Sequence, residues 1–178
     1  MQQPLKNRRL VCADIVKYQE TISVQTDKAP VISKEAPPYA DIYELVLCIL
    51  AYAEMMANHS RYDGIKFGYR AEDFKKLDEL YTKTRTKALS LDCKLAAIMG
   101  AHVLSQENYK RLYEKAMKIR RMIKESIKFD DYDVLQVPLS SPLAVLCGLP
   151  SLTFGDVQLV ANVKNENALW AAWEVANS

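Results

Sequence analysis

Apolar residues recur from residue 42 to residue 57 at the three- and four-residue spacing of one helix face. Five of them form a single stripe: Ile42, Leu45, Ile49, Tyr52 and Met56. Three more apolar residues lie beside the stripe: Val46, Leu50 and Ala53. The pattern predicts a largely buried helix from Asp41. Because the run contains acidic residues and is short for a bilayer, no membrane span is expected.

The same periodicity predicts three further helices, over residues 72–88, 91–103 and 105–127. Ser90 and Ser105 stand where side-chain oxygens can cap the first free N–H groups of the second and third of these helices. Asp92 and Glu107 follow in the first turns, where the helix dipole favours negative charge. Residues 59–70 (HSRYDGIKFGYR), with two glycines among aromatic and charged residues, predict an ordered loop.

Short runs rich in β-branched residues predict strands towards both ends of the chain. The N-terminal pair covers residues 9–16 and 18–26, and the prolines of residues 28–41 predict an extended connection after it. The C-terminal strands are YDVLQV, SLTF and DVQLVANV, with the Pro-bounded loop PLSSPLAVLCGLP between the first two. The last helix follows Asn165 as its cap, and Trp170 and Trp173 are expected to dock it onto the sheet or onto a partner.

These elements predict an α/β fold in which a mixed β-sheet is covered by helices. A length of 178 residues fits a single domain, residues 1–178. Its parts would be a strand pair with a Pro-rich connection over 1–40, a helical middle over 41–130, and strands with the final helix over 131–178.

The composition excludes several classes of function but does not identify one. The 24 basic and 22 acidic residues give a formal charge of +2, too small for nucleic-acid or membrane binding by overall electrostatics. Four cysteines without a CxxC pair suit reduced thiols in the cytoplasm. His59 and His102 have no partners at metal-ligand spacing, so no metal is expected. No other cofactor is expected either.

Several segments resemble, in order and spacing, the C-terminal part of the amidase-signature family, and within it the glutamyl-tRNA(Gln) amidotransferase A subunits. The matching segments are RYDGIKFGYR (61–70), ELYTKTR (79–85), IMGAHVLS (98–105), YEKAMKIRRMI (113–123) and DYDVLQVP (131–138). CGLPSLTF (147–154) continues the resemblance more weakly. The resemblance implies the C-terminal portion of the amidase-signature fold.

The family's chemistry uses a serine nucleophile, a second serine in a cis peptide and a lysine, in or near a Gly/Ser-rich run. This chain has five glycines and no such run, so no catalytic residue is expected in it. Ser140 and Ser141, between two prolines, are typical of a turn. Lys94 stands near the position where the family has a carboxylate-binding arginine, and Pro138 where it has an amine-binding acid. Between Pro138 and Cys147 the family carries a longer connection.

Four residues of the RYDGIKFGYR segment remain candidates for a vestigial substrate-binding site: Tyr62, Asp63, Tyr69 and Arg70. Tyr62 resembles a pocket-lining tyrosine of the family. A packing role for this aromatic ring is the alternative, and we favour it.

The resulting hypothesis is a non-catalytic binding or scaffold protein that forms a homo-oligomer or binds a protein partner, such as amidotransferase subunits. The alternative is one piece of a split amidase or amidotransferase that is active only with a partner chain. A degenerating product without a function of its own is a third possibility. The basic helix could also contact RNA weakly through Lys110, Lys118 and Arg121.

Overall fold

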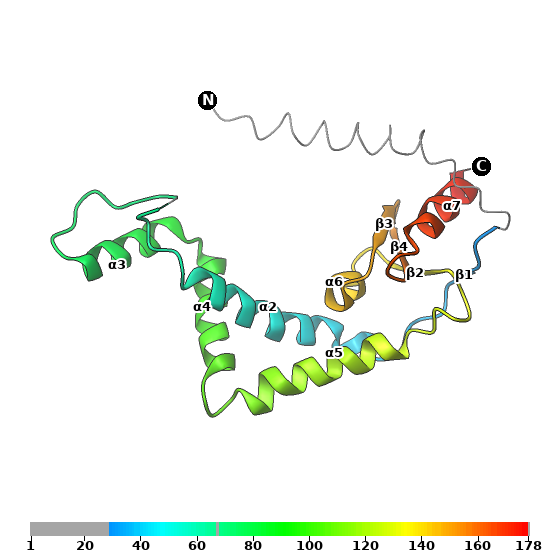
Figure 1. The fold of residues 1–178 in the computed structure, drawn as a ribbon, viewed down its shortest axis with the longest axis horizontal. Coiled ribbons are helices and arrows are strands. Elements are labelled where there is room, and N and C mark those ends of the chain that lie inside the picture. Colours follow the sequence, from blue (N-terminus) through cyan, green and yellow to red (C-terminus); the bar gives the residue numbers. More distant parts are fainter. Residues whose placement is uncertain (1–28, 67, 178) are drawn as a thin grey trace. The chain divides into compact units, whose positions relative to one another are not determined.

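The computed structural model of the chain describes residues 29–66 and 68–177 and divides into two compact units (Figure 1). The sheet unit contains the described residues up to Glu35, together with Phe129–Leu139 and the residues from Pro150. The helical unit contains Ala36–Lys128 and Ser140–Leu149. The strands expected over residues 9–16 and 18–26 lie outside the described residues.

Four strands form the sheet of the first unit, in the order β1-β2-β4-β3. They are β1 (Ile32–Ser33), β2 (Val134–Pro138), β3 (Ser151–Phe154) and β4 (Val157–Ala161). β1 runs parallel to β2, whereas β4 is antiparallel to both of its neighbours. The α/β fold with a mixed sheet is therefore confirmed. The expected extended connection contains one short strand, β1, whose neighbour Val31 donates its N–H to the Asp133 carboxylate over 2.9 Å.

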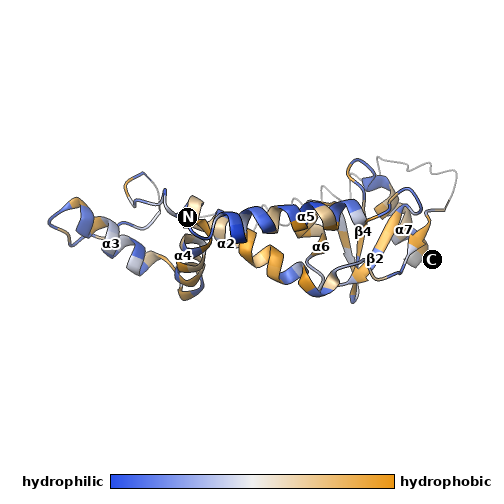
Figure 2. Ribbon diagram, turned by 90° about the horizontal axis from the view of Figure 1, so that it is seen from below, coloured by the Kyte–Doolittle hydropathy of each residue, from blue (hydrophilic) through white to orange (hydrophobic). Residues whose placement is uncertain are grey.

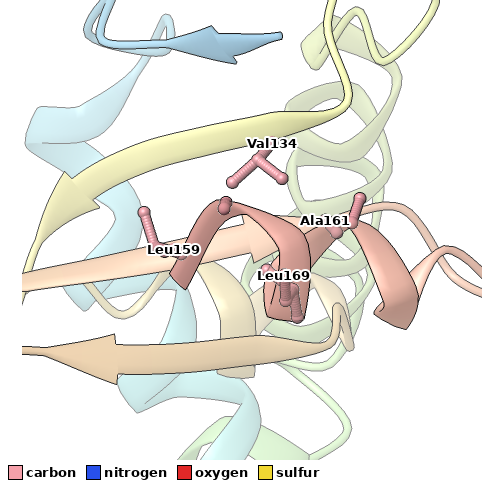
Figure 3. Packing of buried hydrophobic residues seen from close by; sticks show 6 residues of the cluster. Val134, Leu159, Ala161 and Leu169 are labelled. Carbon is pink, nitrogen blue, oxygen red and sulfur yellow. The ribbon is translucent and has the colours of Figure 1, made fainter. Parts of the chain in front are cut away.

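The core of the sheet unit forms where α7 (Glu166–Asn177) packs on β2 and β4. Its buried residues are Val134, Leu159, Ala161, Ala168, Leu169 and Ala172, and Figure 3 shows them gathered between the helix and the strands. Trp170 and Trp173 are only half-buried. The small alanines and Leu169 form the buried part of this helix face, and whether the tryptophans dock it onto the sheet or onto a partner stays a prediction.

The helical unit consists of helices and helical turns from the middle of the chain, together with one short helix, α6, from Ser140–Leu149. In chain order these are η1 (Ala40–Ile42), α2 (Tyr43–His59), α3 (Leu77–Ala88), α4 (Leu91–Leu104), η2 (Lys110–Glu114), α5 (Lys115–Ser126) and α6 (Leu143–Cys147). Ser90 caps α4 as expected, because its hydroxyl accepts the Cys93 N–H. Ser105 instead ends α4, and its hydroxyl donates to the His102 carbonyl over 2.8 Å.

The helix expected over 105–127 starts later and begins with a wider turn. η2 is a π-helical turn, in which the Glu114 N–H bonds to the Tyr109 carbonyl five residues back. α5 begins at Lys115, although the N–H groups of Tyr109 and Leu112 already bond to the carbonyls four residues back. Periodicity alone misses such a turn, because the apolar positions on either side keep nearly helical spacing.

α3 also starts later than residue 72, because the preceding segment is held by α3 itself. Glu79 accepts the Lys75 N–H over 2.8 Å, and Lys83 donates to the carbonyl and the carboxylate of Asp73. These side chains fix residues 73–75 as a loop that folds back on the helix.

α6 is a short helix inside the expected Pro-bounded loop, and its residues Leu143, Ala144, Leu146 and Cys147 are buried. Gly148 ends it in the left-handed conformation, with φ of 65°. The cluster of apolar residues in PLSSPLAVLCGLP was thus the sign of a buried helical turn.

α2 and α4 pack closely at Gly100. A side chain at this position would overlap the Tyr52 carbonyl oxygen and approach Met56 Cβ to 2.6 Å. α2 therefore buries Val46, Leu50 and Ala53, the residues beside the expected stripe, while Leu45 within the stripe is 63% exposed. The residues beside the expected stripe are thus more buried than the stripe itself, and Leu45 is an exposed exception on a helix expected to be largely buried.

We predict that Gly100→Ala lowers the free energy of unfolding measured by urea titration. Alanine normally gains up to about 1 kcal/mol over glycine in a helix interior. Overpacking costs about 1–3 kcal/mol, and the rigid Tyr52 backbone should make that cost prevail. A variant as stable as the wild type, or more stable, would show that the helices can separate without cost.

Candidate functional site

The four candidate substrate residues lie together in the loop between α2 and α3. Tyr62 is half-buried, and its hydroxyl donates to the Tyr69 carbonyl over 3.0 Å, which closes the loop. Gly68 has φ of 81°, and a Cβ there would lie 2.6 Å from the Tyr62 ring. The tyrosine ring and the glycine backbone are therefore in direct contact.

α3 anchors this loop through two side chains. Thr84 is fully buried, and its hydroxyl oxygen accepts the Ala71 N–H over 3.1 Å. Arg85 donates to the carbonyls of Tyr62 and Ser60 over 3.0 and 2.9 Å. Both side chains belong to the segment ELYTKTR, which was expected to match the family but not to anchor the loop. The hydrogen bonds span 13 to 25 positions of the chain, so no local signal in the sequence marks these two side chains as anchors.

The two charged candidates also have contacts within this region. Asp63 accepts the Ile65 N–H over 2.8 Å, and this bond is the main cause of a lowered pKa of its carboxyl group. The Arg70 guanidinium lies 5.4 Å from the centre of the Phe74 ring, within the range of a cation–π contact. The loop thus brings Tyr62, Asp63, Tyr69 and Arg70 together, with polar contacts that order the loop itself.

Three other positions correspond to functional residues of the family or resemble them, and in this structure each of them takes part in secondary structure or in a backbone contact. Lys94 donates to the Thr86 carbonyl at the end of α3 over 2.8 Å. Ser141 accepts the Leu143 N–H over 3.4 Å, as expected for a turn before α6. Pro138 ends β2, opposite Val157.

Arg120 ties α5 to α6, since its Nε donates to the Leu146 carbonyl over 2.6 Å. The neighbouring Cys147 is buried, and burial raises the pKa of its thiol, with a smaller opposing effect from Arg120. A thiol of this kind is a poor nucleophile, because nucleophilic attack requires the thiolate.

The cations proposed for RNA lie on the exposed part of η2 and α5, where hydrophilic residues follow the helix (Figure 2). Lys110, Lys118 and Arg121 are exposed, and Arg121 forms an ion pair with Glu125 at 2.7 Å.

Within the described ranges, no group of three His, Cys, Asp or Glu residues could hold a metal ion. None of the helices in those ranges has the length and apolar character to cross a membrane.

Two surfaces of the helical unit are apolar and open to solvent. The first, called here the α4 apolar face, consists of Leu91, Leu95, Ile98 and Met99, which are 70%, 52%, 66% and 47% exposed. The second is a groove between α2 and the η2–α5 helix. Neither surface could be predicted from the sequence, because an apolar helix residue does not show whether its partner lies in the same chain.

Comparison with known proteins identifies the family. The amidase family model matches residues 16–176. The A subunit of glutamyl-tRNA(Gln) amidotransferase from Lachnoclostridium phytofermentans is 41% identical over 98 residues, which are 54% of this chain and 20% of that protein. The corresponding protein of Maridesulfovibrio salexigens is 42% identical over 113 residues, which are 62% of this chain and 23% of that protein. The A subunit from Clostridium botulinum strain Loch Maree is 31% identical over 132 residues, which are 73% of this chain and 27% of that protein.

The chain belongs to the amidase family. It is similar to the C-terminal part of these A subunits, as the resemblance of its segments indicated. It spans about a fifth to a quarter of the length of the curated relatives it matches.

We predict that Thr84→Val lowers the free energy of unfolding by about 1–3 kcal/mol, because the buried Ala71 N–H loses its acceptor. Thr82→Val is the matched control. Thr82 is exposed on the same helix and donates to the Asp78 carbonyl. Its replacement should change stability by less than about 0.5 kcal/mol. Equal losses in urea titrations of the two variants would rule out the anchoring role of Thr84.

Proposed function

We propose that this chain is a non-catalytic binding module of the amidase family that acts by associating with protein chains, first of all with itself. The α4 apolar face is the observation that carries the proposal. α4 buries Ala96, Gly100 and Val103 towards the core, while the face with Leu91, Leu95 and Ile98 is left in water. A helix that is apolar on all sides is normally buried on all sides.

The spacing on the α4 apolar face suits a second copy of the same helix. Leu91, Leu95, Ile98 and His102 follow one another at intervals of four, three and four residues, the spacing of a coiled-coil seam. In an antiparallel pair around a two-fold axis, Leu95 would meet Ile98 of the other copy. Neither charged residue of α4, Asp92 or Lys94, stands at a seam position, so pairing would bury no charge.

The loop with Tyr62, Asp63, Tyr69 and Arg70 is proposed as a vestige of a substrate-binding loop that now serves packing. The contact of the Tyr62 hydroxyl with Tyr69 and that of the Asp63 carboxylate with Ile65 support this proposal. A cytoplasmic location and a weak RNA contact through Lys110, Lys118 and Arg121 are further proposals, supported by thiol usage and by the exposure of these cations.

We predict that the wild-type chain is a dimer in light scattering at micromolar concentration and that Leu95→Glu/Ile98→Glu is a monomer. The reason is that pairing would then bury four carboxylates at the seam. Met122→Glu/Val145→Glu is the matched control, since these apolar residues are 54% and 71% exposed outside α4. This control should remain dimeric. A monomeric wild type would contradict self-association.

A second candidate is one piece of a split amidase or amidotransferase. The observation that favours it is the limited coverage of the relatives, of which the matched segments make up 20% to 27%. In this candidate the nucleophile and the Gly/Ser-rich run come from another polypeptide.

The split-enzyme candidate predicts that amide hydrolysis appears only on mixing. The chain would be combined with the N-terminal part of one of the related amidotransferase chains, and ammonia release from glutamine would be measured. Activity in the mixture, absent from each component, would establish the split enzyme. A stable complex without activity would leave the binding module as the function.

A further inference from the structure

The groove between α2 and the η2–α5 helix is open to solvent and has a volume of about 300 Å³. Aliphatic side chains from both helices line it, with Val46 and Ala116 buried and Leu112 and Ile119 half-buried. Leu45 on the α2 side is 63% exposed. All of these residues belong to the helical unit.

Charge is distributed unevenly around this groove. Arg111 and Lys115 line it on the η2–α5 side, and both are exposed. They are four residues apart across the π-helical turn, so about one turn of helix separates them. No acidic residue is among the residues that line the groove. The groove therefore combines an aliphatic surface with a cationic edge.

We propose that this groove binds an amphipathic helix of a protein partner, with the apolar stripe of that helix against the aliphatic residues and acidic residues beside Arg111 and Lys115. Two acids four residues apart on the bound helix would match the spacing of the two cations. The inference rests on the proposed function, because it names a second kind of partner for the same binding module.

A small amphiphilic ligand fits the groove less well. Pockets for small ligands enclose most of the ligand surface and usually have volumes of about 300–1,000 Å³. This groove lies at the lower end of that range, and the exposure of Leu45 shows that one side remains in water. A helix, in contrast, would cover the full length of an open groove.

A second copy of the chain is disfavoured by charge. Residues 110–126 contain seven basic and two acidic residues. A two-fold contact through this groove would bring two such basic helices together, and like charges across an interface oppose association. The self-association proposed for α4 involves other residues.

The test uses two fluorescein-labelled synthetic peptides of about 18 residues, long enough for five helical turns. Both have leucines at helical spacing. One has glutamates along one edge of the apolar stripe, and the other has lysines at the same positions. Fluorescence anisotropy with the full chain should show at least about ten-fold tighter binding of the glutamate peptide, a difference of about 1.4 kcal/mol.

Three variants locate the binding. Arg111→Glu/Lys115→Glu should invert the preference, so that the lysine peptide binds tighter. Lys118→Glu/Lys124→Glu changes the net charge equally on the same helix, at exposed positions that do not line the groove. This control should keep the preference for the glutamate peptide. Leu45→Asn should weaken binding of the glutamate peptide without changing the thermal unfolding temperature, because Leu45 is already mostly exposed.

Several results would overturn the inference. They are equal affinity for the two peptides, no binding of the glutamate peptide at millimolar concentration, equal losses in the two charge-reversal variants, or complete displacement by decanoate at submillimolar concentration. Repeating the measurement with Leu95→Glu/Ile98→Glu separates the two proposals. An unchanged peptide preference in that variant, whatever its oligomeric state, means that the groove binds independently of the α4 apolar face.

Discussion

The close contact of α2 with α4 at Gly100 determines the exposed surface of α4. Because no side chain stands at this position, the backbone of α4 reaches the Tyr52 carbonyl, and both helices bury their small residues there. That orientation turns Leu91, Leu95 and Ile98 of α4 to solvent. The α4 apolar face thus follows from this point of helix packing. The groove beside Leu45 forms separately, where η2 and α5 lie along α2.

Much of the architecture could be predicted from the sequence, since local signals carry it. The Ser90 cap, the β-branched run of β2 and the helical periodicity of α2 and α4 indicate their elements directly. What periodicity could not show was which of two adjacent stripes on α2 meets a neighbour. Val46, Leu50 and Ala53 are buried on a face with several neighbours: α4 meets α2 at Gly100, and the η2–α5 helix lies beside Val46.

In the candidate loop, too, the sequence predicted some features and not others. Its position and order followed from two glycines among aromatic residues, but its anchors, Thr84 and Arg85, belong to the next helix. Long-range hydrogen bonds of this kind have no local pattern in the sequence. The membership in the amidase family agrees with the resemblance of the loop and its neighbouring helices, while the side-chain contacts explain how this segment keeps its shape.

The wide turn at Lys110–Glu114 has a consequence for how relatives can vary in length. A π-helical turn holds one residue more than an ordinary turn over a similar rise, so it absorbs a single insertion without breaking the helix. Each added residue rotates the side chains that follow by about 100°. A family member without this extra residue would therefore direct a different set of side chains from α5 towards α2.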